Sequence, residues 1–321
     1  MSEKTRLKTI MIVLALSASV LAAPPAVHAQ LVTGLQGAAG STIGPGGDLF
    51  VTEGLVGRVS RVDPDNGAVT TFAEGLPPAV IGVGGAADVA FIGDTGYVLV
   101  TLVSLFSNAT DGIYRIDGPN SYTVIADLGA YTLANPSDVP WDIPTGVQWS
   151  IEPYRGGLLV SEAHHNRVLW VSQDGEIREL RAFDNVVPTG VEVLGSTIYL
   201  ALTGPAPHEP EDGRVVSFDP DSDSVQLEAS GARLLLDVES GRGRSLFALS
   251  QGQWNGQFPG SPAIENDGAL WEINADGSLR LVADGIDRPT SLEIIGNDAY
   301  VVTLTGNIVR IEDIARPPFR R

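Results

Sequence analysis

The chain has no cysteine, and its only two lysines and two methionines lie within the first 11 of its 321 residues. The absence of cysteine excludes disulfide bonds, thiolate metal ligands and cysteine nucleophiles. After residue 11 there is no lysine for Schiff-base or general-base chemistry. Basic residues are also few, 20 against 39 acidic ones, which gives a net charge of −19. Binding to nucleic-acid phosphates needs a basic face, so we expect no nucleic-acid partner.

Long apolar runs are scarce as well. The longest covers residues 9–23 and follows three basic residues, Lys4, Arg6 and Lys8. Residues 1–29 therefore predict a secretory signal peptide, with Val27-His28-Ala29 as the cleavage site. The alternative, a membrane anchor, is disfavoured because a span needs about 20 apolar residues. We expect a secreted or periplasmic protein with no membrane span after cleavage. Its charge would be −21, because the segment carries three basic residues and one acidic residue.

The remainder of the chain is rich enough in apolar residues to form a large core. Hydrophobic residues make up 43% of the sequence and charged residues 18%, which excludes intrinsic disorder. A soluble chain of this length forms one large domain or two ordinary ones.

One sequence unit recurs six times. Gly57-Arg-Val-Ser-Arg-Val-Asp-Pro-Asp65 resembles Gly213-Arg-Val-Val-Ser-Phe-Asp-Pro-Asp221, and related segments begin at residues 112, 166, 268 and 306. Short strands rich in β-branched and aromatic residues flank each of them, separated by Gly, Asp, Asn and Pro turns. No stretch after the signal peptide shows sustained helical periodicity. Six four-stranded units of this length predict an all-β protein, a six-bladed β-propeller over residues 30–314, followed by a short basic tail, 315–321.

The last unit is one strand short, since residues 287–314 contain only three predicted strands. Leu31-Val-Thr-Gly-Leu35 is similar to Phe72-Ala-Glu-Gly-Leu76, the outer strand of the first unit. We therefore expect the N-terminal strand to complete the last blade and close the ring.

Loop lengths distinguish the two faces of this propeller. Turns between first and second strands and between third and fourth strands are short. The insertions all fall on the opposite face, at residues 76–85, 102–110, 127–142, 203–212 and 251–267. Long loops on a rigid scaffold are where binding residues collect, so this long-loop face is the expected binding face. Neutral variation in loop length is the alternative.

Four carboxylates are expected at the channel mouth on that face. Asp88 and Asp237 begin inner strands of opposing blades, and Glu53 and Glu162 end second strands. Together they predict a site for Ca²⁺ or another divalent cation. Catalysis is an alternative, with Asp88, Asp237, Glu162 and His164 as candidates. In a third interpretation each Asp only binds the backbone of a neighbouring loop.

Other polar and aromatic residues are expected on the same face. His164 and His165 end a strand and should point in opposite directions, so both are not expected to bind one metal. A zinc site would join one of them to His208 and to Glu162 or Glu209, but the spacing of these residues in the sequence is weak evidence for it. Exposed aromatic residues there would stack on a flat ligand or pack the loops together. The predicted ligand-face residues are Thr145, Thr189, Thr290, Trp141, His208 and Trp254.

The repeated Pro-Thr-Gly-Val segments, as at Pro188–Val191, and the Arg-Val-Asp-Pro-Asp turns resemble the ScyD/ScyE family. That family comprises exported six-bladed propellers akin to NHL-repeat and gluconolactonase-like proteins, and the resemblance covers residues 31–314. It implies the fold and export but no settled reaction. Gluconolactonase-like enzymes hold a divalent metal at the channel mouth. Here Thr145 and Thr189 stand where an Asn ligand would be expected.

We therefore expect an exported, monomeric binding or scaffold protein that takes a small molecule or a protein on its long-loop face. The alternative is a metal-dependent hydrolase, lactonase or lyase at the channel mouth. A secreted structural protein without a ligand is a third class.

Overall fold

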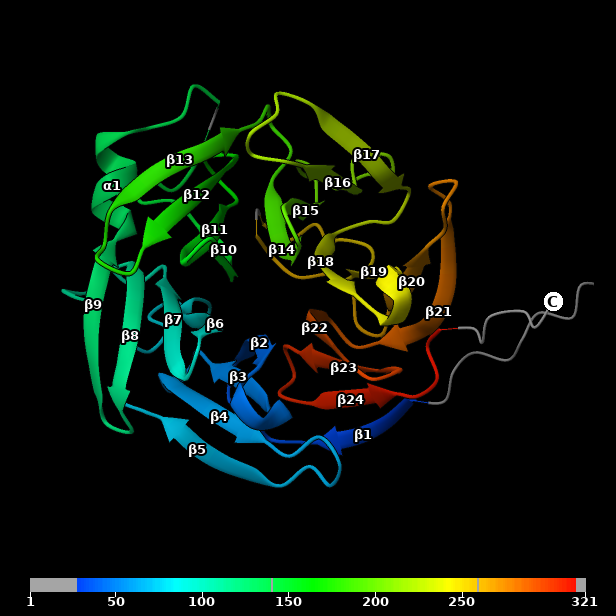
Figure 1. Ribbon diagram of the computed structural model, residues 1–321, viewed down its shortest axis with the longest axis horizontal. Helices are drawn as coiled ribbons and strands as arrows, with labels where there is room; N and C mark the ends of the chain where they lie inside the picture. Colours follow the sequence, from blue (N-terminus) through cyan, green and yellow to red (C-terminus); the bar gives the residue numbers. More distant parts are fainter. Residues whose placement is uncertain (1–27, 140, 259, 316–321) are drawn as a thin grey trace, which may run out of the picture.

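The structure, a computed structural model, describes residues 28–139, 141–258 and 260–315. They form six four-stranded antiparallel sheets set as blades around a central axis (Figure 1). The predicted six-bladed β-propeller is thus confirmed. Nearly all of the predicted signal peptide and C-terminal tail lies outside the described residues. Within the described part of the chain, no helix is long and apolar enough to cross a membrane.

The blades follow one another in chain order, and the first strand of blades 1 to 6 is the innermost (Figure 1). Blade 1 comprises β2 (Ala38–Ile43), β3 (Leu49–Glu53), β4 (Arg58–Val62) and β5 (Val69–Ala73). Blade 2 comprises β6 (Gly85–Ile92), β7 (Thr95–Thr101), β8 (Gly112–Gly118) and β9 (Ser121–Asp127). Blade 3 comprises β10 (Gln148–Tyr154), β11 (Gly157–Glu162), β12 (Arg167–Ser172) and β13 (Ile177–Ala182).

The second half of the ring repeats this order. Blade 4 comprises β14 (Pro188–Leu194), β15 (Thr197–Leu202), β16 (Arg214–Phe218) and β17 (Val225–Ser230). Blade 5 comprises β18 (Leu235–Ser240), β19 (Leu246–Ser250), β20 (Gly268–Ile273) and β21 (Leu279–Ile286). Blade 6 comprises β22 (Pro289–Ile295), β23 (Asp298–Thr303), β24 (Ile308–Ile311) and β1 (His28–Val32).

The N-terminal strand closes the ring, as predicted: β1 pairs with β24 and lies beside it in Figure 1. β1 begins three residues before the expected segment 31–35 and ends at Val32. Val32 is the counterpart of Ala73, where β5 ends. The resemblance extends further, because the Leu35 N–H donates to the Gly306 carbonyl at 3.0 Å and the Leu76 N–H to the Gly57 carbonyl at 3.0 Å. The same kind of three-residue segment, 33–35 and 74–76, therefore follows both outer strands.

Removing the closing segment is expected to destabilise the whole ring. Val32 and Leu35 are 5% and 7% exposed, and each such buried side chain contributes about 1.5–3 kcal/mol. A chain that starts at Ala38 should therefore melt about 10 °C lower in calorimetry. As a control, the double variant Val32→Ala, Leu35→Ala keeps the backbone pairing of β1. Its melting temperature should therefore fall by only part of that amount. An unchanged melting temperature in the truncated chain would show that the ring closes without β1.

One helix was not expected from the sequence. α1 (Leu128–Ala134) lies in the insertion between blades 2 and 3, where only a loop was predicted. Asp127 caps it by accepting the Ala130 N–H at 2.8 Å. With seven residues it is too short to show a helical period, which explains why the pattern missed it.

The core is divided among the six junctions between blades. Each junction contains one cluster of buried apolar side chains drawn from the two blades that meet there. A side-chain hydrogen bond also crosses every junction near the axis, and every one of them uses a Ser, Thr or Asp. The six pairs are Ser41–Ser291, Thr52–Ala87, Asp88–Ile151, Ser150–Thr189, Thr189–Leu235 and Asp237–Leu292. Apolar packing and these bonds together fix the ring.

Candidate functional site

The two faces of the propeller differ as the sequence predicted. Connections between first and second strands are short, for example residues 93–94 and 155–156. The long connections run between second and third strands or between blades. They all emerge on the long-loop face, at residues 74–84, 102–111, 128–147, 203–213 and 251–267.

The long-loop face also carries most of the exposed apolar side chains. Among the described residues, 12 of the 19 large hydrophobic side chains that are exposed lie in its loops and turns. They are Leu55, Val56, Val80, Ile81, Val83, Leu105, Phe106, Leu133, Trp141, Phe258, Ile264 and Leu304. Exposed apolar side chains gathered on one face are typical of an interaction surface.

An ion pair between a Glu and an Arg, which we call the Glu–Arg clamp, holds the turn between the second and third strands in blades 1 and 3. In blade 1, Arg58 donates to both oxygens of Glu53, at 2.8 and 2.7 Å. In blade 3, the Arg167 Nε donates to the Glu162 Oε2 at 2.5 Å. In both blades the Glu ends its strand and the Arg stands five residues later. The residue before each Arg, Gly57 or Asn166, has a positive φ that closes the turn.

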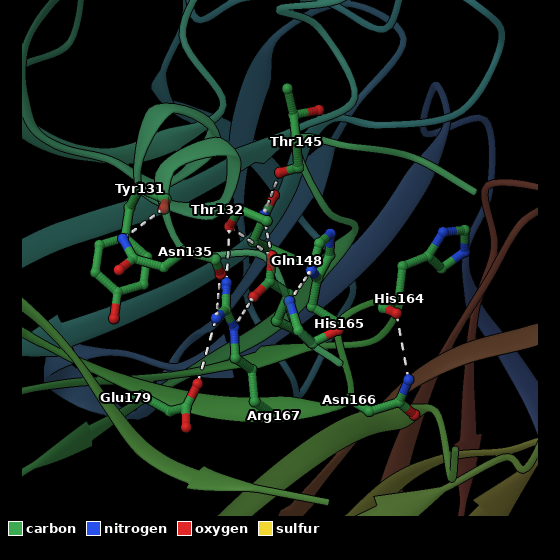
Figure 2. Close-up of polar contacts among 12 residues, drawn as sticks. Tyr131, Thr132, Asn135, Thr145, Gln148, His164, His165, Asn166, Arg167 and Glu179 are labelled. Carbon is green, nitrogen blue, oxygen red and sulfur yellow. Dashed lines mark hydrogen bonds and ion pairs between the residues drawn. The ribbon is translucent and has the colours of Figure 1, made fainter. Parts of the chain in front are cut away.

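In blade 3 this clamp also anchors the inserted helix (Figure 2). The Thr132 hydroxyl of α1 donates to the Glu162 Oε1 at 2.7 Å, and the Arg167 Nη1 donates to the Asn135 carbonyl at 2.7 Å. Gln148 Nε2 adds a longer bond to the Glu162 Oε1, at 3.3 Å. The Arg167 and Glu162 side chains are 2% and 0% exposed, so this pair is almost fully removed from water.

His164 and His165 occupy the tip of the same turn, where blade 1 has Leu55 and Val56. They point in different directions, as predicted: in Figure 2 the His164 ring lies away from the clamp. His165 is 1% exposed, its Nδ1 accepts the Ser137 N–H at 3.2 Å, and its ring stacks on Trp141. Burial lowers the pKa of both histidines, so they are neutral at pH 7. His164 Nδ1 and His165 Nε2 are buried without a hydrogen-bond partner among the described residues.

The other predicted ligand-face residues divide into two groups. Thr189 and Thr290 are buried, and their hydroxyls donate to backbone carbonyls, of Leu235 and Val302 respectively. These two hydroxyls thus serve the fold rather than the surface. Thr145 is also buried, but its Oγ1 has no partner among the described residues.

The aromatic residues of the long loops pack against imidazole rings. Trp141 is 37% exposed and stacks on His165, with ring centroids 5.0 Å apart. Trp254 meets His208 edge to face at 5.9 Å, and its indole N–H donates to the Ser261 hydroxyl. Both contacts hold the loops in place, and Trp141 keeps part of its ring open to solvent.

Asp88 and Asp237 lie at equivalent positions of blades 2 and 5 and make the same bonds. The Asp88 Oδ2 accepts the Ile151 N–H of the next blade at 2.8 Å, and its Oδ1 accepts the Val89 N–H. The Asp237 Oδ2 accepts the Leu292 N–H of the next blade at 2.8 Å. Both carboxylates therefore join neighbouring inner strands.

Four more carboxylates line the central channel and were not singled out in the sequence. Glu152, Glu192, Glu239 and Glu293 come from the inner strands of blades 3 to 6 at one register. They pair across their blades with Leu159, Tyr199, Phe247 and Tyr300. The sequence contained a sign of this set, because each of the four inner strands has a Glu directly after an apolar residue, as in Ile151-Glu152 and Leu292-Glu293. With Asp88 and Asp237 they make a set of six, which we call the channel carboxylates.

The channel carboxylates are electrostatically strained. Burial is the largest cause that raises the pKa of all six, and for Asp237 the value reaches about 7. Repulsion within the set adds to the effect of burial: Glu293 and Glu192 raise the pKa of Glu239, and Asp237 and Glu152 raise the pKa of Glu293. Hydrogen bonds from Ser240 and Val193 moderate the shift of Glu192. Burial and repulsion thus both favour the protonated forms of the channel carboxylates relative to free carboxyl groups.

The predicted four-carboxylate metal set is not brought together. Glu53 and Glu162 are each paired with an Arg in separate blades, while Asp88 and Asp237 bind backbone N–H groups. Burial raises the pKa of Glu53, but bonds from Arg58, Ser60 and Gln36 outweigh it and bring the pKa below its usual value. Within residues 28–139, 141–258 and 260–315, no three His, Asp or Glu side chains are arranged to hold a metal ion. The expected calcium site therefore does not fit these four residues.

Comparison with known proteins supports the fold class. No protein-family model and no curated protein matches the chain. A gluconolactonase structure from Xanthomonas campestris matches with a TM-score of 0.63 and 11% identity, over 89% of each chain. The PQQ-bound aldose sugar dehydrogenase of Streptomyces coelicolor matches with a TM-score of 0.57 and 15% identity, over 90% of this chain and 99% of that one. A chain of the nidogen/laminin complex matches with a TM-score of 0.53 and 12% identity, over 79% of this chain and 84% of that one. The chain is a six-bladed β-propeller with gluconolactonase-like structural neighbours.

Proposed function

We propose that the protein is an exported binding module that takes its partner on the long-loop face. The observation that carries the proposal is the gathering of 12 exposed large hydrophobic side chains on the loops of that face. Burial of such side chains against a partner supplies the free energy of association. The sequence resemblance to exported ScyD/ScyE-like propellers supports the proposal, as does the fold shared with a chain of the nidogen/laminin complex.

Selection of a phage-displayed library of random 12-residue peptides on the full immobilised chain tests the proposal. We expect binders whose affinity falls at least about tenfold in the double variant Leu105→Ser, Phe106→Ser, since central apolar contacts dominate such interfaces. Leu227→Ser is the matched control, because Leu227 is 62% exposed against 55% for Phe106 but lies on outer strand β17. Binders that ignore the Leu105 and Phe106 changes but respond to Leu227→Ser would contradict the proposal.

An enzyme, a hydrolase or lyase, is the second candidate. It is favoured by His164, a half-buried imidazole whose lowered pKa keeps it neutral at pH 7 on the same face. The charge of Asp142 opposes that shift, so a carboxylate lies near the ring. Turnover of a lactone or ester panel that His164→Ala abolishes would support this candidate. Elemental analysis together with melting in EDTA would test its metal-dependent form.

A further inference from the structure

Two hollows adjoin at the outer rim of the junction between blades 1 and 2. The first, of about 300 Å³, is lined by Val56, Arg58, Glu74, Gly75 and Asn120. The second, of about 570 Å³, is lined by residues 75–80 together with Ser107, Ala109 and Tyr122. Gly75 belongs to both, and a side chain built there would meet nothing within 4 Å. Because the two hollows share Gly75 and nothing fills the space beside it, we treat them as one open groove, which we call the rim groove.

The two ends of the rim groove differ in chemistry. The larger end is walled by Pro77, Pro78, Val80 and Ala109, with the Tyr122 ring beside them. The smaller end carries the two charged residues, Arg58 and Glu74. Arg58 is committed to the buried Glu53, whereas Glu74 makes no ion pair among the residues the structure describes. One end thus offers apolar contact and the other an exposed carboxylate.

We propose that the rim groove binds an extended peptide segment of a partner protein, with apolar side chains in the larger end and a basic residue opposite Glu74. This inference rests on the proposed binding function and names its partner class. An open groove leaves one side of its occupant in solvent, which suits a chain that continues past the groove at both ends. The position of Glu74 at one end sets the direction in which the peptide lies.

Charge distinguishes this occupant from a second copy of the protein. The chain carries a net charge of −19, so two copies repel each other while a basic segment is attracted. The same charge speeds association with a basic peptide at low salt. Binding should therefore weaken as ionic strength rises, in the way that an apolar contact alone would not.

The peptides selected on the full chain provide the probe. We expect them to share an Arg or Lys at a fixed spacing from two or more aromatic or aliphatic residues. Val80→Arg, at a residue 44% exposed, should weaken their binding by about tenfold or more, because it blocks the apolar end and repels the basic residue. Glu74→Gln should weaken it less and reduce its salt dependence, since it removes only the charge.

Leu227→Arg supplies the control for an added charge at an exposed apolar position off the groove and should leave binding unchanged. Thermal melts of each variant verify that the fold is intact. Binding that depends on Leu105 and Phe106 but is unaffected by Val80→Arg and Glu74→Gln overturns the rim groove while the proposed function stands. Binding that depends on none of these residues overturns both. Selected peptides without a basic residue overturn the role of Glu74.

Discussion

The free energy of unfolding is expected to rise as pH falls from about 8.5 to about 6.5. Burial and mutual repulsion raise the pKa of the channel carboxylates, so the folded state retains protons that the unfolded state has released. Where the folded state binds more protons, stability decreases with rising pH. Each carboxyl that is protonated only in the folded state contributes about 1.4 kcal/mol per pH unit.

Other groups limit this gain at lower pH. His164, His165 and His208 have lowered pKa values, so below about pH 6.5 the unfolded state takes up protons that these buried rings refuse. Glu53 has a lowered pKa, and its contribution is lost as pH falls through that value. At pH 6.5 the unfolded histidines are only half protonated, so between about 8.5 and 6.5 the opposing effect of these three groups should stay smaller than that of the six channel carboxylates.

Urea unfolding at pH 6.5 and 8.5 measures the effect, and Glu293→Gln assigns it. Gln keeps the shape of a protonated Glu but has no proton to release on unfolding. This variant should therefore be more stable than the original chain at both pH values, and by a larger margin at the higher one. Glu265→Gln is the control, because its side chain is 72% exposed. A stability that is flat or falls between pH 8.5 and 6.5 would show that the channel carboxylates are ionised in the folded protein.

Arg167→Ala is expected to be far more destabilising than Arg58→Ala. Each substitution removes the Arg of a Glu–Arg clamp, in blade 3 and in blade 1 respectively. The Arg167 side chain is 2% exposed, whereas that of Arg58 is 30% exposed. Removing one partner of a buried pair leaves the other charge buried, at a cost of about 3–5 kcal/mol. The blade 1 clamp is nearer to solvent, and Glu53 retains bonds from Ser60 and Gln36, so there we expect about 1–2 kcal/mol.

Urea unfolding of the two variants makes the comparison within one chain. The double variant Glu162→Gln, Arg167→Met should recover much of the loss, because it leaves no unpaired charge. Arg167→Ala should also free α1, since Arg167 binds the Asn135 carbonyl at its end. Faster proteolysis near residues 128–139 would report that release. Equal destabilisation by Arg167→Ala and Arg58→Ala would contradict the assignment of the blade 3 pair as the more buried one.

The sequence revealed the repeated units, but it did not reveal which side chains contact each other within and between the blades. It predicted the ring, its closure by the N-terminal segment, and the face that carries the long loops. It missed α1, which is held by a cap and by the clamp rather than by its own period. It also grouped Glu53 and Glu162 with Asp88 and Asp237. The alignment of strand ends cannot reveal that each Glu forms an ion pair with the Arg five residues later.

The amino-acid sequence by itself determined the blades, because strand period, turn glycines and the Asp-Pro turns act over a few residues and recur in every unit. Only the tertiary structure decided which carboxylates share the channel, because Glu152, Glu192, Glu239 and Glu293 come from four blades and meet only when the ring closes. The rim groove is likewise made by loops 74–84 and 102–111, whose walls face each other only because blades 1 and 2 pack together. Electrostatic strain and surface shape depend on distances through space, which a local pattern does not contain.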